Sequence, residues 1–465
     1  MGGGVNWKSG FSIVAIFLMA CAQTTEFVRP ALPVPDQWTQ SSGELASVAT
    51  KTHWKEFFSD PQLQSLISLA LENSRDLRIA AGRVQEARAQ FGIARADLLP
   101  TINAMGSGNL THTSSDLSGI GAPLTSRRFD LATSSASYEI DFWGRVASLN
   151  EAARLSYLAS EESRRSVYIS LISDVALTYL TLLQNKELIA DEQSNVALRE
   201  HSLLLIQKGF QAGAANDFEY QQARSLFESA HATLSGYEYQ FTVAHNRLNL
   251  LLGNAAYDLK LDARLDQQGL DSALAPGLPA EVLLLRPDVM AAEQRMRATH
   301  VNIAAARAAF LPRVVLTASL GLASQGLAGL FSGGAWAFQP MITMPLFDGG
   351  RTAAGVELAE ARKVIAVAEY ERAIQVAFRE VADLMASRKS LARQLESAHV
   401  GVQAQVRRLE IAQGRYDAGV SGYLDVLEAQ RELIAAQQMA VQVRRAQLES
   451  NVQLYKALGG GSESV

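Results

Sequence analysis

The sequence predicts an α+β membrane protein made of two internal repeats, each with a β-hairpin and a pair of very long helices. Three observations lead to this fold class. Four short motifs recur in the same order in the two halves of the chain. The segment from Gly144 to about Gln211 lacks proline and has glycine only near its ends, which permits one continuous helix. Segments of about ten residues alternate apolar and small polar residues, the length that a tilted membrane-spanning strand needs.

The N-terminal residues 1–20 have the features of a bacterial export signal. Lys8 precedes an apolar run at 11–20, which is too short to span a bilayer as a helix. The run ends in Leu-Met-Ala-Cys, which looks like the lipobox of bacterial lipoproteins. Cys21 would then carry the N-terminal lipid and is the predicted lipidation site. The alternative is a buried cysteine in a plain signal peptide. No later segment is expected to form a transmembrane helix, so a membrane crossing must use strands.

A proline-rich stretch follows Cys21, and residues 21–59 are expected to form an extended, lipid-anchored tether. The first repeat then occupies 60–265 and the second 266–460, and 461–465 form a tail. The matching motifs are 94–100 with 306–312, 142–145 with 348–351, 210–213 with 416–419, and 248–253 with 454–459. The last three pairs keep a constant offset of 206 residues. The predicted hairpins lie at about 101–141 and 313–347, and the long helices at about 144–253 and 350–458.

The long helices show coiled-coil spacing. Tyr168, Val175, Leu182 and Ile189 recur at intervals of seven, in a segment about 100 Å long at ~1.5 Å per residue. Gly213 breaks the first long helix, and Gly419 occupies the equivalent place in the second repeat. Because helix ends favour a residue with positive φ, we expect these two glycines to form the turns of the helical hairpins.

The strands are predicted to carry an apolar face and a small polar face, which suit lipid and a wet lumen respectively. In the second strand we expect Ala132, Tyr138 and Ile140 on the apolar face and Thr133 on the polar one. Tyr138 and Trp336 are the expected aromatic residues of the membrane interface. The alternative is a soluble hairpin packed on the helices. Four strands are too few to close a water-filled barrel, so further copies must supply the rest.

Composition excludes several functions. With 42 Lys+Arg against 47 Asp+Glu, the net charge is −5, which gives no basic face for nucleic acid. One cysteine permits neither an intrachain disulfide nor a Cys-rich zinc or iron–sulfur site. The seven histidines show no metal-ligand spacing, and phosphate-loop, dinucleotide and serine-nucleophile motifs are missing. We therefore expect no enzyme, no catalytic residues, no metal, and no cofactor other than the lipid.

Several motifs together resemble outer membrane factors, the lipidated OprM-like and NodT-like relatives of TolC. They are Trp-Lys-Glu-Phe-Phe-Ser-Asp-Pro at 54–61, Arg-Ala-x-x-Leu-Pro at 95–100 and 307–312, Leu-Arg-Pro-Asp-Val at 285–289, Pro-Leu-Phe-Asp-Gly-Gly-Arg at 345–351 and Tyr-Lys-Ala-Leu-Gly-Gly at 455–460. The resemblance implies a homotrimer that closes a twelve-stranded barrel in the outer membrane of a Gram-negative bacterium and continues as an α-barrel across the periplasm. It further implies a periplasmic membrane-fusion adaptor and an inner-membrane transporter of the RND type as partners, and efflux of drugs or other small toxic molecules as the function.

The same resemblance suggests a periplasmic gate. Asp425 and Glu428 are three residues apart, so they share a helix face, and in TolC-like proteins acidic positions in this stretch line the narrow mouth. Tyr416 matches a family tyrosine that is expected to hydrogen-bond across helices. No arginine closely follows Gly419, unlike the family's arginine-based latch. The alternative is an acidic pair on a solvated helix start.

Two other functions stay open at this point. A type I protein-secretion exit duct uses the same architecture. A periplasmic coiled-coil lipoprotein that forms no channel is the other candidate, although such a spacer would not need amphipathic strand pairs of bilayer length.

Overall fold

The computed structural model describes residues 27–35, 53–254, 259–270 and 283–460, without the side chains of 134–137. Cys21, the predicted signal peptide, much of the tether and the tail lie outside these residues. The chain divides into two compact units. Unit 1 comprises Met1–Ala31, Arg83–Glu161 and Ala291–Tyr370, and unit 2 comprises Leu32–Gly82, Glu162–Met290 and Glu371–Val465.

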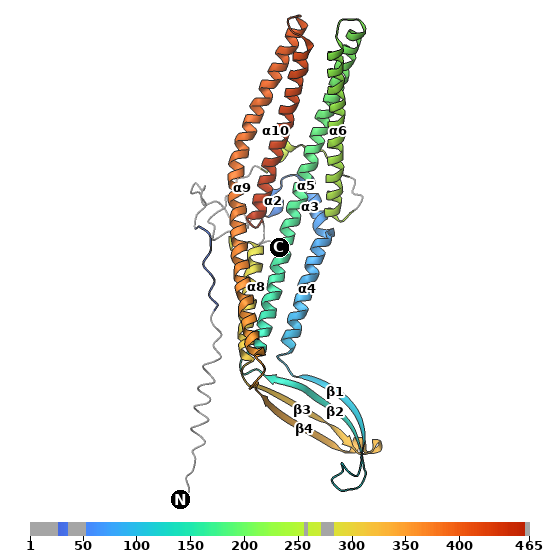
Figure 1. The fold of residues 1–465 in the computed structure, drawn as a ribbon, viewed down its shortest axis with the longest axis vertical. Coiled ribbons are helices and arrows are strands. Elements are labelled where there is room, and N and C mark those ends of the chain that lie inside the picture. The colour runs from blue at the N-terminus through green and yellow to red at the C-terminus, as the bar shows by residue number, and fades with distance from the viewer. Residues whose placement is uncertain (1–26, 36–52, 255–258, 271–282, 461–465) are drawn as a thin grey trace. The chain divides into compact units, whose positions relative to one another are not determined.

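The described elements follow the order expected for two repeats of helices, hairpin and long helices (Figure 1). In chain order they are α2 (Trp54–Phe57), α3 (Pro61–Asn73), α4 (Arg75–Ala96), β1 (Thr101–Thr113), β2 (Leu124–Ile140), α5 (Arg145–Gln211), α6 (Asp217–Leu252), η2 (Leu265–Gln267), α8 (Pro287–Ala308), β3 (Arg313–Ser324), η3 (Leu327–Ser332), β4 (Gly334–Thr343), α9 (Arg351–Asp417) and α10 (Tyr423–Ala457). α9 begins and ends 206 residues after α5 begins and ends.

The strands form one antiparallel sheet in unit 1, with the order β1-β2-β3-β4. Among the described residues, β1 and β4 therefore each have a strand partner on one side only. The strands of the first hairpin are longer than the predicted length of about ten residues, because β1 runs to Thr113 and β2 from Leu124 to Ile140. The sheet has the length and the open edges of a barrel segment rather than of a closed barrel.

The register divides the sheet into two chemically different faces, since directly paired residues point to the same side. One face carries the apolar residues Ile102, Leu110, Phe129, Leu131, Tyr138, Ile140, Val314, Leu316, Leu320, Leu322, Trp336, Phe338 and Ile342. The other face carries the polar residues Asn103, Ser107, Asn109, Thr111, Arg128, Asp130, Thr317, Ser319, Gln339 and Thr343. Many of the large apolar side chains are exposed in the single chain, among them Ile102 and Trp336.

The predicted face of the second strand is wrong for its first half. The pairing shifts by one residue between Ser135 and Tyr138, which is a β-bulge. Thr133 pairs with Leu320 and Tyr138 with Leu316, so both lie on the apolar face, and Ala132 lies on the polar one. Strict alternation of the two faces along the whole strand requires a ladder without a bulge.

The four long helices make two antiparallel hairpins, α5 with α6 and α9 with α10 (Figure 1). Val175 and Leu182 of the heptad pattern are fully buried, whereas Tyr168 and Ile189 are only partly covered. Between Ile169 and Leu188, α5 is buried on more of its surface than a two-position seam requires. This explains why α5, contrary to expectation, contains a window apolar enough to cross a membrane: 61% of that window is buried inside the protein.

An aromatic cluster and a polar contact hold the centre of unit 2. Phe57 stacks on Tyr455 with ring centroids 4.4 Å apart, and Phe58 meets the same ring edge-on at 5.9 Å. Asp60 caps α3, where its Oδ1 accepts from the backbone N–H of Gln62 at 2.8 Å. The predicted helix start at Asp60-Pro61 therefore lies next to the core that α3, α5, α6 and α10 share, to which α3 contributes Leu63.

Polar contacts also tie the ends of the sheet to the helices of unit 1. The Arg145 guanidinium forms a bidentate pair with the Glu139 carboxylate at 2.9 and 2.7 Å, and Arg313 donates to the same carboxylate. Asp141 accepts from the first backbone N–H groups of α5, and the Trp143 indole donates to the carbonyl of Pro312 at 2.7 Å. These bonds satisfy the groups that a helix start leaves unpaired and fix where the strands end.

Candidate functional site

The candidate site begins at the turns of the two helical hairpins. Gly213 has a φ of 75° and Gly419 a φ of 71°, and each is the second residue after the end of a 67-residue helix. The same hydrogen-bond pattern closes both turns. The backbone N–H of Ala214 donates to Gly209 O at 2.8 Å, and that of Val420 donates to Arg415 O at 2.9 Å. Both turns are thus Schellman motifs, in which glycine supplies the left-handed residue.

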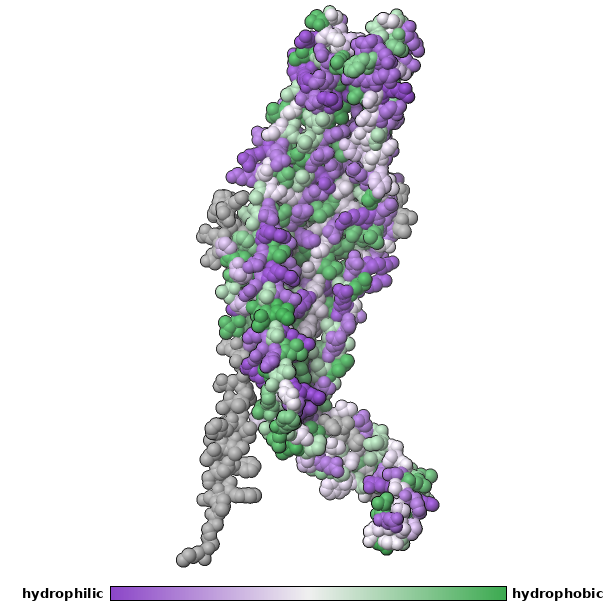
Figure 2. All heavy atoms as spheres, viewed as in Figure 1, coloured by the Kyte–Doolittle hydropathy of each residue, from purple (hydrophilic) through white to green (hydrophobic). Residues whose placement is uncertain are grey.

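The two hairpin ends lie at the same end of unit 2, and Figure 2 shows hydrophilic and hydrophobic surface interspersed over them. The helices that leave the turns start differently. Asn216 and Glu219 form a reciprocal capping box at the start of α6, whereas Gly422 starts α10 without a side-chain cap. Glu219 is the counterpart of Asp425 in the first repeat, and its carboxylate accepts a hydrogen bond from the backbone N–H of Asn216.

Asp425 and Glu428 lie in the first turns of α10, and both are exposed. Glu428 is not unpaired, because Arg408 Nη2 lies 3.6 Å from its Oε1. This arginine comes from α9, before the turn, so the sequence after Gly419 could not indicate it. Both side chains are about half exposed, at 47% and 53%, which makes the ion pair worth at most about 1 kcal/mol.

Within the part of the chain that the structure describes, the Tyr416 hydroxyl has no cross-helix hydrogen bond of the kind expected. Its ring packs edge-on against Tyr423 at 5.0 Å, within a cluster that includes Ala412 and Val426. The hydroxyl of Tyr423 makes the cross-helix bond instead, to Ser202 Oγ of α5 at 2.7 Å. Tyr416 lies three residues before Gly419 and Tyr423 four residues after it, so the motif match alone could not tell which of the two hydroxyls makes the bond.

Further polar bonds connect α5 to α10 behind the turns. Arg199 Nη1 donates to Gln430 Oε1 at 3.2 Å, and Gln438 Nε2 donates to Glu192 Oε2 at 3.0 Å. Burial lowers the pKa of the Arg199 guanidinium, although an arginine stays charged at any physiological pH. Since buried polar groups are costly without partners, these bonds favour one arrangement of the two hairpins.

The two predicted interface aromatics are close together along the sheet. Tyr138 pairs with Leu316 and Trp336 with Leu320, which are four residues apart on β3, about 13 Å at ~3.3 Å per residue. The apolar band of a membrane barrel is about 25 Å tall, so this spacing does not place them at opposite interfaces. Trp336 is 78% exposed near the η3 end of the sheet, while the Tyr138 hydroxyl donates to Leu98 O at 3.4 Å near the helical end.

Known proteins resemble this chain over almost its whole length. The chain matches the outer membrane efflux protein family over residues 66–254 and 278–460. It is 41% identical to the solvent efflux pump outer membrane protein SrpC of Pseudomonas putida, over 98% of this chain and 99% of that protein. It is 39% identical to the outer membrane protein OprJ of Pseudomonas aeruginosa, over 97% and 95% of the two chains.

Solved structures of similar chains agree with the fold. A membrane protein from Pseudomonas aeruginosa superposes with a TM-score of 0.87 at 37% identity, covering 94% of this chain and 100% of that one. The open state of the MtrE outer membrane channel of Neisseria gonorrhoeae gives a TM-score of 0.85 at 33% identity, with 94% and 97% covered.

Proposed function

This chain belongs to the outer membrane efflux protein family, and from that premise we propose that three copies close one continuous channel wall. The resemblance drawn from the sequence motifs is confirmed at the level of the family. The protein is an outer membrane channel of an efflux pump in a Gram-negative bacterium, and the family consists of transport proteins rather than enzymes.

The observation that carries the trimer proposal is the two-faced sheet with open edges. An apolar face suits lipid and a polar face suits a wet lumen, yet β1 and β4 each leave one row of backbone groups unpaired. Each such group costs several kcal/mol in lipid. Since β1 and β4 run antiparallel, β4 of one copy can pair with β1 of the next, and three copies give twelve strands. The long helices then continue the conduit as an α-barrel.

The pump partners and the cargo extend this proposal. Relatives are named for solvent and toluene efflux, which favours small toxic organic molecules as the cargo here. The helical hairpin ends would dock a periplasmic adaptor, and an inner-membrane transporter of the RND type would supply the cargo. A lipid on Cys21 would add an anchor to the outer membrane.

The gate is proposed at the start of α10. Three copies would place six carboxylates, from Asp425 and Glu428, around the periplasmic mouth. The exposure of both residues beside the Gly419 turn supports this. Acidic rings favour cations. The Arg408 partner of Glu428 would hold half of these carboxylates when the hairpins are in the present arrangement.

Single-channel recording in planar bilayers tests the channel, and native mass spectrometry tests the number of copies. Gly321→Val is the informative variant, because a Cβ there would lie 2.4 Å from both Ala132 Cα and Leu131 O and would separate β2 from β3. Gly326→Val is the matched control, since a Cβ at Gly326 meets nothing within 4 Å.

We expect trimers and conductance steps from the native chain and from Gly326→Val, and no steps from Gly321→Val. A stable trimer without steps would indicate a periplasmic spacer and would refute the channel. Export of a protein substrate, with no gain of solvent tolerance in cells, would favour a protein-secretion duct.

A further inference from the structure

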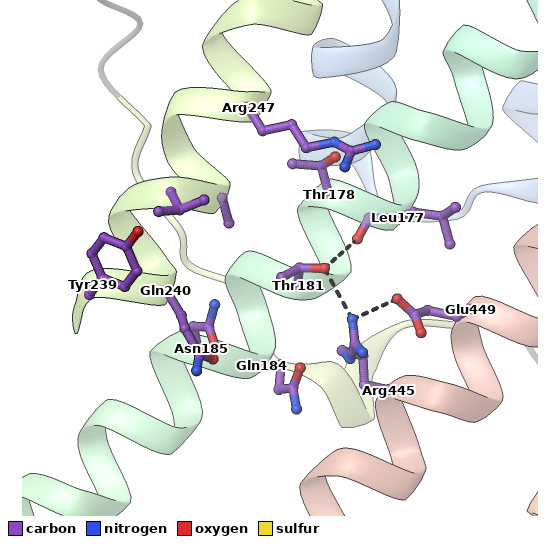
Figure 3. Close-up of a pocket in the computed structure, with 12 residues that line it drawn as sticks. Leu177, Thr178, Thr181, Gln184, Asn185, Tyr239, Gln240, Arg247, Arg445 and Glu449 are labelled. Atoms are coloured by element: carbon purple, nitrogen blue, oxygen red, sulfur yellow. Dashed lines mark hydrogen bonds and ion pairs between the residues drawn. The ribbon is translucent and has the colours of Figure 1, made fainter. Parts of the chain in front are cut away.

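A cavity of about 540 Å³, lined by both polar and apolar side chains, lies in unit 2 (Figure 3). Its walls come from α5, α6 and α10. The lining residues are Leu177, Thr178, Thr181, Gln184, Asn185, Tyr239, Gln240, Val243, Ala244, Arg247, Arg445 and Glu449. This volume is in the range of small-molecule sites, and polar side chains outnumber the apolar ones.

Two hydrogen-bond donors in this cavity lack acceptors within the described part of the chain. Asn185 is only 2% exposed, and its buried Nδ2 has no partner. The Nε of Arg445 is likewise buried without a partner. Leaving such a buried donor unpaired is unfavourable. The cavity therefore lacks acceptors rather than donors.

The remaining hydrogen bonds of Arg445 fix the position of its guanidinium group. Its Nη1 donates to Thr181 Oγ1 of α5 at 3.2 Å and to Glu449 Oε1 of α10 at 2.6 Å (Figure 3). Thr181 in turn donates to Leu177 O at 2.9 Å. These contacts fix the guanidinium between two helices, while its buried Nε keeps no partner among the described residues. Burial raises the pKa of Glu449, which shows that its negative charge is poorly solvated there.

The charge and the apolar walls define the ligand class. Arg247 and Arg445 against Glu449 leave one net positive charge in the lining. Leu177, Val243 and the methyl group of Ala244 give an apolar wall. We propose that this cavity binds a small organic monoanion with an apolar body, such as an aromatic carboxylate, whose oxygens accept from Asn185 and Arg445. Such a ligand would join α5, α6 and α10.

Calorimetric titration of the detergent-solubilised full-length protein with benzoate tests the site. Benzyl alcohol keeps the ring without the charge, and acetate keeps the charge without the ring, so both should bind at least about tenfold more weakly. We expect Arg445→Gln and Asn185→Leu to weaken benzoate binding about tenfold or more, because each removes a donor to the anion.

Glu449→Gln separates binding from a purely structural role. It removes the carboxylate that competes for Arg445, so benzoate binding should tighten several-fold. Arg444→Gln is the matched control, since the neighbouring Arg444 donates to Gln447 on its own helix and does not line the cavity.

The proposal is overturned if the native protein shows no saturable benzoate binding, which would mean a cavity filled by water only. It is also overturned if Arg445→Gln binds benzoate as the native chain does, or if Glu449→Gln weakens binding. Should Arg445→Gln fail to fold, the opposite effects expected of Asn185→Leu and Glu449→Gln still decide.

Discussion

Replacing Asp60 by alanine should destabilise unit 2 far more than the loss of one surface carboxylate. Besides capping α3, Asp60 Oδ2 accepts from the Tyr179 hydroxyl and from Gln268 Nε2, both at 2.8 Å. Tyr179 is fully buried, and Gln268 is 3% exposed. One carboxylate thus joins α3, α5 and the segment after η2.

The size of the effect follows from these contacts. Losing the cap costs about 1 kcal/mol. The Gln268 amide loses a charged acceptor while buried, which costs about 2 kcal/mol. The Tyr179 hydroxyl can turn to Gln62 Oε1, 3.0 Å away, and so loses little. We expect Asp60→Ala to lower the free energy of unfolding by about 3 kcal/mol, and Tyr179→Phe by about 1 kcal/mol.

Denaturant unfolding in detergent, followed by the intrinsic tryptophan fluorescence to which the buried Trp54 contributes, measures these differences. Asp266→Ala is the control, because that carboxylate is 69% exposed and should change stability by less than about 0.5 kcal/mol. A loss below about 1 kcal/mol for Asp60→Ala, or an equal loss for Asp266→Ala, would refute the reasoning.

Three further outcomes are expected. Cys21→Ala should abolish incorporation of labelled palmitate while the channel still inserts, and labelling of the mutant would show that the lipobox assignment is wrong. Replacing both Gly213 and Gly419 by valine should disturb adaptor cross-linking more than membrane insertion, since a β-branched residue resists the positive φ of each turn; normal cross-linking with lost insertion would contradict this. Asp425→Ala combined with Glu428→Ala should lower cation selectivity and abolish block by divalent cations from the periplasmic side, and unchanged values of both would exclude these residues from the gate.

The elements could be predicted from the sequence because local signals mark them. The signals are proline at 100 and 312, glycine after the long helices, and the lack of proline within those helices. The element starts and ends that they predict lie within a few residues of the observed ones. The heptad positions Val175 and Leu182 are indeed buried, but the neighbouring positions are buried too. The number of neighbours around a helix depends on the whole fold. The spacing of residues along that one helix does not reveal it.

Contacts that depend on pairing between distant segments could not be predicted. The bulge of β2 becomes visible only when its register against β3 is known. The Arg408–Glu428 pair depends on how α9 and α10 align across their turn. The unpaired Asn185 amide reflects the packing of three helices, and no pattern in its own neighbourhood indicates it.

The open edges of the sheet have a genetic consequence. If three chains complete one barrel, a subunit whose β1 or β4 cannot pair spoils every assembly that it enters. In a cell that makes equal amounts of native and edge-defective chains, only about one-eighth of randomly assembled trimers would be wholly native. Edge mutations in this protein should therefore be dominant over the native allele, whereas a chain that never folds would stay out of the trimers and be recessive.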